Sequence, residues 1–126
     1  MLGRGRSVTV LAYGAPVDMR RSFDGLAGMV RDVLGEDPLS GALYLFVSRD
    51  RRRAKVLLWD GTGLCIYAKR LEQGRFTAPW RCGGEEAVVR LTMSELDLLL
   101  EGMALEGRLP LSPAPFSWES HSARSR

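Results

Sequence analysis

Residues 57–76 read LLWDGTGLCIYAKRLEQGRF, and this stretch decides the fold. Two apolar runs typical of β-strands meet at Asp60-Gly-Thr-Gly63. Asp-Gly between such runs is a strong hairpin signal, because Gly61 adopts a positive φ without a Cβ clash. Upstream, a strand-like run at 42–47 is joined by a basic segment at 48–53 to the run at 54–59. Three consecutive runs with short polar connections predict an antiparallel meander.

The rest of the chain is predicted to cover one face of this sheet. A strand is expected at 8–13, and Asp18 is expected to cap a helix whose apolar residues recur at helical spacing up to Leu34. Gly35 is expected to end that helix. A short strand at 88–91 precedes Thr92-Met-Ser-Glu95, which has the pattern of a capping box opening a second helix.

These elements predict an α+β fold, an antiparallel β-meander sheet of about four to five strands packed with two principal helices. The length of 126 residues is that of one domain, expected at 8–104. The Gly/Arg-rich segment 1–7 is expected to fray. The Pro/Ser-rich segment 105–126 is expected to form an irregular, partly disordered tail.

Composition argues against several classes of chemistry. The spacing of Cys65 and Cys82 fits neither a zinc site nor a disulfide framework, so a buried free thiol is expected at Cys65. The one histidine, His121, lies in a polar segment unsuited to rigid catalytic geometry. No apolar run reaches the roughly 20 residues of a membrane span. We therefore expect a cytoplasmic protein with no catalytic residues, no metal, no cofactor and no membrane partner.

One carboxylate cluster remains as an alternative. Asp18, Asp24 and Asp60 could in principle meet and hold a magnesium ion. Roles as helix cap, first-turn charge and turn residue explain the three aspartates better. Gly61-Thr-Gly63 has no lysine at the spacing of a phosphate-binding loop and is better explained as a turn.

Basic residues indicate a binding surface. Net charge is only +3, yet sixteen of the 18 basic residues are arginine, which suits phosphate contacts. A meander brings the loop before one strand and the far end of the next to the same edge of the sheet. The predicted nucleic-acid-binding residues are Arg49, Arg51, Arg52, Arg53, Lys55, Lys69, Arg70 and Arg75, with Arg20 and Arg21 as possible additions.

Aromatic side chains near these residues offer stacking surfaces, namely Trp59, Tyr67, Phe76 and Trp80. Trp59 and Tyr67 are equally well explained as cross-strand partners. The arginines themselves could instead form a solvated loop that blunts a sheet edge and keeps the protein soluble.

Five separated blocks also resemble a known family. They are DMRRSFDGL at 18–26, DPLSG at 37–41, WDGTGLC at 59–65, KRLEQGRF at 69–76 and LLEG at 99–102. In this order they resemble the TnpB-type accessory protein of the insertion-sequence-66 family of bacterial mobile elements, from about residue 8 to 103. The RNA-guided nuclease of the same name is unrelated. Two departures are Thr77-Ala-Pro79-Trp80, where the family tends to place an aromatic directly before the proline, and the segment after 103.

The resemblance implies a non-catalytic protein encoded beside a larger transposase, which carries the strand-transfer chemistry. We therefore expect an accessory protein that assists DNA transposition by binding DNA, the transposase or both. A second hypothesis is an interaction module that docks on the transposase without touching DNA. A third is a small magnesium-dependent nuclease using the three aspartates.

Overall fold

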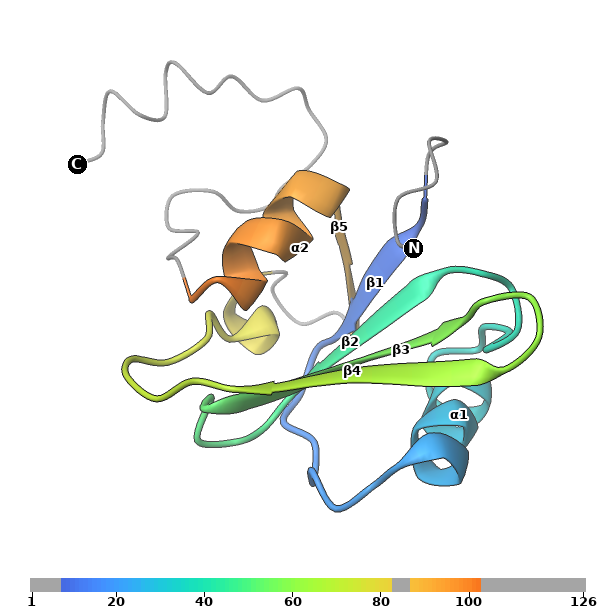
Figure 1. Ribbon diagram of the computed structural model, residues 1–126, viewed down its shortest axis with the longest axis horizontal. Coiled ribbons are helices and arrows are strands. Elements are labelled where there is room, and N and C mark those ends of the chain that lie inside the picture. Colours follow the sequence, from blue (N-terminus) through green and yellow to red (C-terminus); the bar gives the residue numbers. More distant parts are fainter. Residues whose placement is uncertain (1–7, 83–86, 103–126) are drawn as a thin grey trace.

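The computed structural model describes residues 8–82 and 87–102, which form a five-stranded sheet with helices on both faces (Figure 1). The strands have the spatial order β4-β3-β2-β1-β5. In chain order the elements are β1 (Val10–Tyr13), α1 (Phe23–Asp32), β2 (Leu43–Val47), β3 (Arg53–Trp59), β4 (Leu64–Arg70), the short 3-10 helix η1 (Pro79–Arg81), β5 (Val88–Leu91) and α2 (Met93–Leu100).

The predicted meander is confirmed in β2, β3 and β4, which pair antiparallel in sequence order. The connection of β3 to β4 is the expected tight turn, with Gly61 at a φ of 107°. Asp60 organises it, since its Oδ1 accepts hydrogen bonds from the backbone N–H groups of Thr62 at 2.9 Å and Gly63 at 3.0 Å. The chemistry of this turn therefore helps to set the register of β3 and β4.

The sheet is mixed, so the expectation of a purely antiparallel sheet is wrong. β1 runs parallel to β2, with Val10 opposite Leu43, and antiparallel to β5. Parallel neighbours need a long crossover, and here α1 provides it between the two strands. The number of strands and of principal helices agrees with the prediction.

The helices cover opposite faces of the sheet, which corrects the expectation that the chain covers one face. On one face, Leu26, Ala27 and Val30 of α1 share a buried cluster with Tyr44 and Leu57. On the other face, α2 buries Leu96 and Leu99 in a second cluster, which includes Val10, Leu45, Val56 and Phe76. The central strand β2 is buried along its whole length, because both of its faces are covered.

Helix α1 begins later than the sequence indicates. Its N-cap is Ser22, which makes no side-chain capping bond, so the prediction of Asp18 as cap is wrong. Asp18 instead forms a local turn in which its Oδ1 accepts a hydrogen bond from the backbone N–H of Arg20 at 2.9 Å. The predicted end is confirmed, since Gly35 has a φ of 67° just beyond the last helical residues.

Helix α2 begins with the predicted capping box. The Glu95 N–H donates to Thr92 Oγ1 at 3.0 Å, and the Thr92 N–H donates to Glu95 Oε1 at 2.9 Å. The two side chains thereby satisfy amides that the first turn leaves free. Among the described residues, no helix is long and apolar enough to cross a bilayer. The predictions made for residues 1–7 and 105–126 lie outside the described residues.

Candidate nucleic-acid interface

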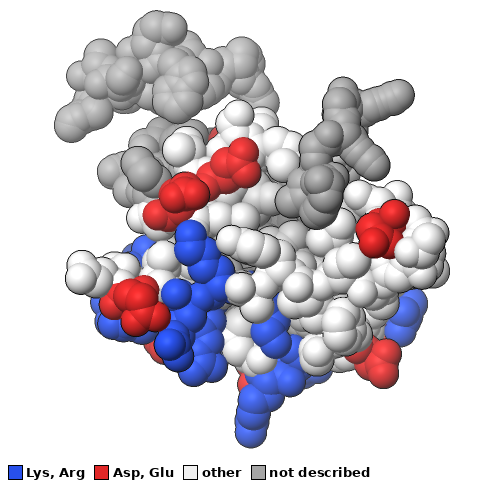
Figure 2. Space-filling view, in the orientation of Figure 1, with Lys and Arg blue, Asp and Glu red and all other residues white. Residues whose placement is uncertain are grey.

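The register of β3 and β4 places two arginines opposite each other. Arg53 begins β3 and pairs with Arg70 at the end of β4. Directly opposed residues have Cβ atoms about 5 Å apart, and like charges there are destabilising. Alternation along the strands puts both side chains on the sheet face that α1 covers. Figure 2 shows Lys and Arg side chains gathered at the lower left, over the end of β4 and the β2–β3 loop.

The β2–β3 loop is held by its own polar side chains. The Ser48 hydroxyl donates to Asp50 Oδ1 at 2.7 Å and accepts from the Arg53 N–H at 3.1 Å, while the Arg52 N–H donates to Asp50 Oδ1 at 3.0 Å. The bonds from Ser48 and then from the Arg52 N–H, together with the nearby charges of Arg53 and Arg52, lower the pKa of Asp50 below its usual value. The loop arginines therefore project from a defined backbone. Sequence reasoning missed Ser48 and Asp50, although their spacing is typical of a polar turn.

Three arginines of the β2–β3 loop and the first position of β3 have side chains without a hydrogen bond or ion pair to any residue that the structure describes: Arg49, Arg52 and Arg53. Arg70 makes one long contact at 3.4 Å with Glu72, and both side chains are mostly exposed. An exposed pair of this kind is worth little. We call Arg49, Arg52, Arg53 and Arg70 the basic rim.

The two lysines among the predicted nucleic-acid-binding residues donate hydrogen bonds to backbone carbonyls of other segments. Lys55 Nζ donates to the carbonyl oxygens of Met19 at 2.9 Å and Arg21 at 2.8 Å, which fastens the segment before α1 to β3. Lys69 Nζ donates to the Leu100 carbonyl at 2.7 Å, at the end of α2 on the opposite face. A cation at a helix C-terminus also interacts favourably with the helix dipole.

Arg51 and Arg75 join the segment after β4 to the β2–β3 loop. Arg75 Nε donates to the Asp50 carbonyl at 3.2 Å. Arg51 has a φ of 62°, its carbonyl accepts from the Phe76 N–H at 2.7 Å, and its guanidinium lies 3.5 Å from the Phe76 carbonyl. Of the eight predicted residues, the structure thus places four at the basic rim and engages four with backbone carbonyls.

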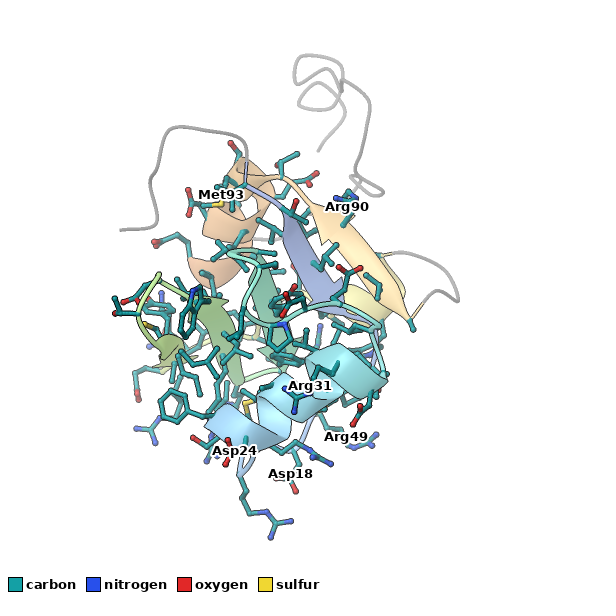
Figure 3. The ribbon with its side chains drawn as sticks, turned by 90° about the vertical axis from the view of Figure 1, so that its right-hand side faces the viewer. Asp18, Asp24, Arg31, Arg49, Arg90 and Met93 are labelled. Atoms are coloured by element: carbon teal, nitrogen blue, oxygen red, sulfur yellow. The ribbon has the colours of Figure 1, made fainter. Side chains whose placement is uncertain are left out.

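Arg20 and Arg21, the possible additions to the predicted nucleic-acid-binding residues, have different surroundings. Arg20 pairs with Asp18 at 2.7 Å, and this hydrogen-bonded pair holds the pKa of Asp18 well below its usual value. Arg21 is exposed, and its backbone is held by Lys55. A shallow hollow between this segment and the β2–β3 loop is lined by Val17, Asp18, Ser48, Arg49, Asp50 and Arg53. Figure 3 shows Asp18 and Arg49 at the same end of the molecule, well away from Arg90.

The predicted stacking surface does not form beside the basic rim. Phe76 is fully buried in the core, and Trp80 packs partly buried against the same cluster. Trp59 lies at the far end of β3 from Arg53 and pairs with Leu64, while Tyr67 pairs with Val56. Trp59 and Tyr67 are therefore not cross-strand partners, and they lie on opposite faces of the sheet.

The three aspartates of the magnesium hypothesis do not form one cluster. Asp18 is bound to Arg20, and Asp60 belongs to the β3–β4 turn at the far end of the strands. Within residues 8–82 and 87–102, no group of three or more His, Cys, Asp or Glu side chains is placed to hold a metal ion. Cys65 is free but only half-buried, which corrects the expected full burial.

Comparison with known proteins points to one family. Residues 8–109 match the family model described as IS66 Orf2 like protein. Two proteins of Sinorhizobium fredii (strain NBRC 101917 / NGR234) are similar over 103 residues, and both are named as uncharacterized. Protein y4hO is 38% identical, with 82% of this chain and 87% of the relative covered. Protein y4jC is 30% identical, with 82% and 86% covered. No solved structure matches.

Proposed function

Because the chain belongs to the IS66 Orf2-like family, and is thereby an insertion-sequence accessory protein, we propose that it assists transposition by binding the phosphate backbone of DNA at its basic rim. The chain acts without chemistry of its own, in the cytoplasm, beside the transposase of the same element. Its task is to hold DNA that the transposase cuts and joins.

One observation carries this proposal: the like-charged pair of Arg53 and Arg70 in direct cross-strand register. Opposed guanidinium groups repel each other. The nearby carboxylates compensate only in part, because Arg70 makes one exposed contact with Glu72 at 3.4 Å and Arg53 forms no ion pair with Asp50. A phosphate oxygen bound by both groups would convert that repulsion into two charge-assisted hydrogen bonds. Arg49 and Arg52 extend the same surface along the loop.

The chemistry of the basic rim favours backbone contacts over base reading. Arginines at a loop and a strand end can follow phosphates, whereas sequence is read by an element that enters a groove. Each neutralised phosphate contributes about −0.9 to the slope of log K against log salt. Four contacts give a slope of about −3.6, so affinity should fall about 150-fold between 50 and 200 mM salt.

The test is fluorescence anisotropy with the full chain, using duplexes of terminal-repeat and random sequence across that salt range. The variant Arg49→Ala/Arg53→Ala should reduce the slope by about 1.8 on both duplexes. Arg31→Ala/Arg90→Ala is the matched control, because it removes the same charge from two exposed arginines of α1 and β5 that do not belong to the basic rim. Arg51 is left unchanged, since its backbone conformation shapes the loop.

Equal slopes for the two double variants would refute a localised contact. Absence of binding by the wild type at 50 mM salt would refute DNA contact altogether. Docking on the transposase without DNA is the second candidate, and apolar exposure favours it: Phe23, Val33 and Leu39 each remain nearly half exposed in and after α1. Co-purification with the transposase that resists nuclease, together with no binding to either duplex, would select that function.

A further inference from the structure

β4 is an open edge of the sheet with an uncharged centre. It is seven residues long and pairs only with β3 among the described elements. Its basic residues stand at one end, and Cys65, Ile66, Tyr67 and Ala68 form the middle. Tyr67 is 49% exposed. Protein edges are usually protected by a central lysine, a proline or a bulge. The other edge strand, β5, is four residues long and carries Arg90 within it.

Backbone bonds in the β3–β4 hairpin determine which groups of β4 point outward. The Leu71 N–H donates to the Arg52 carbonyl, and the Asp60 N–H donates to the Gly63 carbonyl. In an antiparallel pair, hydrogen-bonded and non-hydrogen-bonded positions alternate. Counting from these two bonds, the residues of β4 that direct their N–H and C=O groups away from β3 are Leu64, Ile66, Ala68 and Arg70.

We propose that β4 pairs antiparallel with β4 of a second copy of the chain, with Tyr67 at the two-fold axis. In that register Ile66 of one copy faces Ala68 of the other, and Leu64 faces Arg70. All four are outward-directed positions, so their N–H and C=O groups meet as hydrogen-bonded pairs. The strand is thus complementary to itself, as an isologous interface requires.

The distribution of charge along β4 favours the antiparallel orientation, and it favours a second copy of the chain as the partner. Antiparallel pairing brings the basic end of each β4 beside the other copy's Leu64 and the turn that carries Asp60. Parallel pairing would instead bring the two basic ends together. At the centre, Tyr67 faces its own counterpart at a non-hydrogen-bonded position, where Cα atoms are about 4.5 Å apart and aromatic pairs are favourable.

The pairing joins two five-stranded sheets into one and keeps both α1 helices on the same side. Arg70 lies three residues from the axis, so the two basic rims stand about 20 Å apart along the strands, on the same face. This proposal is independent of the proposed function, because the assembly depends on β4 alone.

Light scattering after size exclusion tests the proposal on the full chain. The wild type should have about twice the monomer mass of 14.0 kDa. Ala68→Pro removes an outward N–H without removing a hydrogen bond to β3. Tyr67→Lys places two like charges across the two-fold axis. Both variants should be monomeric. Arg90→Pro is the matched control. The Gly14 N–H bond to the Ala87 carbonyl makes the Arg90 N–H point outward from β5, so this variant should stay dimeric.

A second measurement fixes the register. Tyr67→Cys should form a disulfide-linked dimer on mild oxidation, since the two Cα atoms lie within disulfide range, whereas the wild type with Cys65 and Cys82 should not. The proposal is overturned by a wild type that stays monomeric at the highest concentration loaded, or by a dimer that survives both Ala68→Pro and Tyr67→Lys. It is equally overturned by a dimer that Arg90→Pro alone abolishes.

Discussion

Lys55 should be a structural residue and not a DNA contact, and replacing it with methionine separates the two roles. The substitution removes two hydrogen bonds, to the carbonyls of Met19 and Arg21, and keeps a long apolar side chain. Hydrogen bonds to a charged group contribute about 1.5–3 kcal/mol each. The bond to Arg21 is exposed, so water replaces part of it, and ordering the lysine costs up to about 2 kcal/mol.

The net loss for Lys55→Met should therefore be about 2 kcal/mol of unfolding free energy. For a chain of this length that corresponds to a fall in Tm of about 6–10 °C. The salt dependence of DNA binding, measured well below Tm, should not change. Arg53→Met is the matched variant, because Arg53 lies two residues away on the same face with a free side chain. It should leave stability within about 0.5 kcal/mol and reduce the salt slope by about 0.9.

Calorimetry or thermal circular dichroism measures the change in Tm, and anisotropy titrations measure the salt slope of DNA binding. A Lys55→Met protein of unchanged Tm would refute the anchoring role. A salt slope reduced as much by Lys55→Met as by Arg53→Met would show that the ammonium group meets phosphate, contrary to the bonds described.

Three further predictions concern stability. Thr92→Ala removes the capping box of α2 and should lower the free energy of unfolding by about 1 kcal/mol at unchanged m, whereas Ser94→Ala, exposed in the same turn, should not. Arg51→Gly should raise that free energy by about 0.5–1 kcal/mol in urea denaturation, because glycine adopts a φ of 62° without strain; a loss would mean that the Phe76 contacts outweigh the strain. The pKa of Asp60 is lowered chiefly by the Thr62 and Gly63 N–H groups, so its contribution is present above the unfolded pKa near 4 and is lost as pH falls toward the folded value. Asp60→Asn should therefore flatten the decline of Tm below about pH 4, and an equally steep decline would contradict this.

Local signals account for what the sequence could predict. Asp60-Gly-Thr-Gly63 determines a turn within four residues, and Thr92 and Glu95 cap a helix within one turn. The mixed sheet could not be predicted in this way, since β1 becomes parallel to β2 only because α1 returns the chain to the same end. The sequence also predicted the wrong role for Asp18. Its carboxylate accepts a hydrogen bond from the backbone N–H of Arg20 in a local turn and does not cap α1.

The sequence could predict where the basic residues gather but not which of their side chains remain free of other contacts. Strand register follows from the hairpin turn, so Arg53 and Arg70 could be expected at one edge. Whether a basic side chain remains free of contacts depends on carbonyl groups that are far away in the sequence. Met19 lies 36 residues from Lys55, and Leu100 lies 31 residues from Lys69. No periodicity in the sequence reports such contacts. The burial of Phe76 is likewise a property of the assembled core.

The position of β1 has a consequence for how this chain is made. β1 lies inside the sheet, yet its partners emerge late: β2 follows α1, and Val10 meets Leu91 only near the end of the described chain. During synthesis the meander can pair while one side of β1 still lacks its neighbour. A ribosome-bound chain stopped before residue 88 should therefore remain sensitive to protease at β1, and long-range closure by β5 should limit the folding rate.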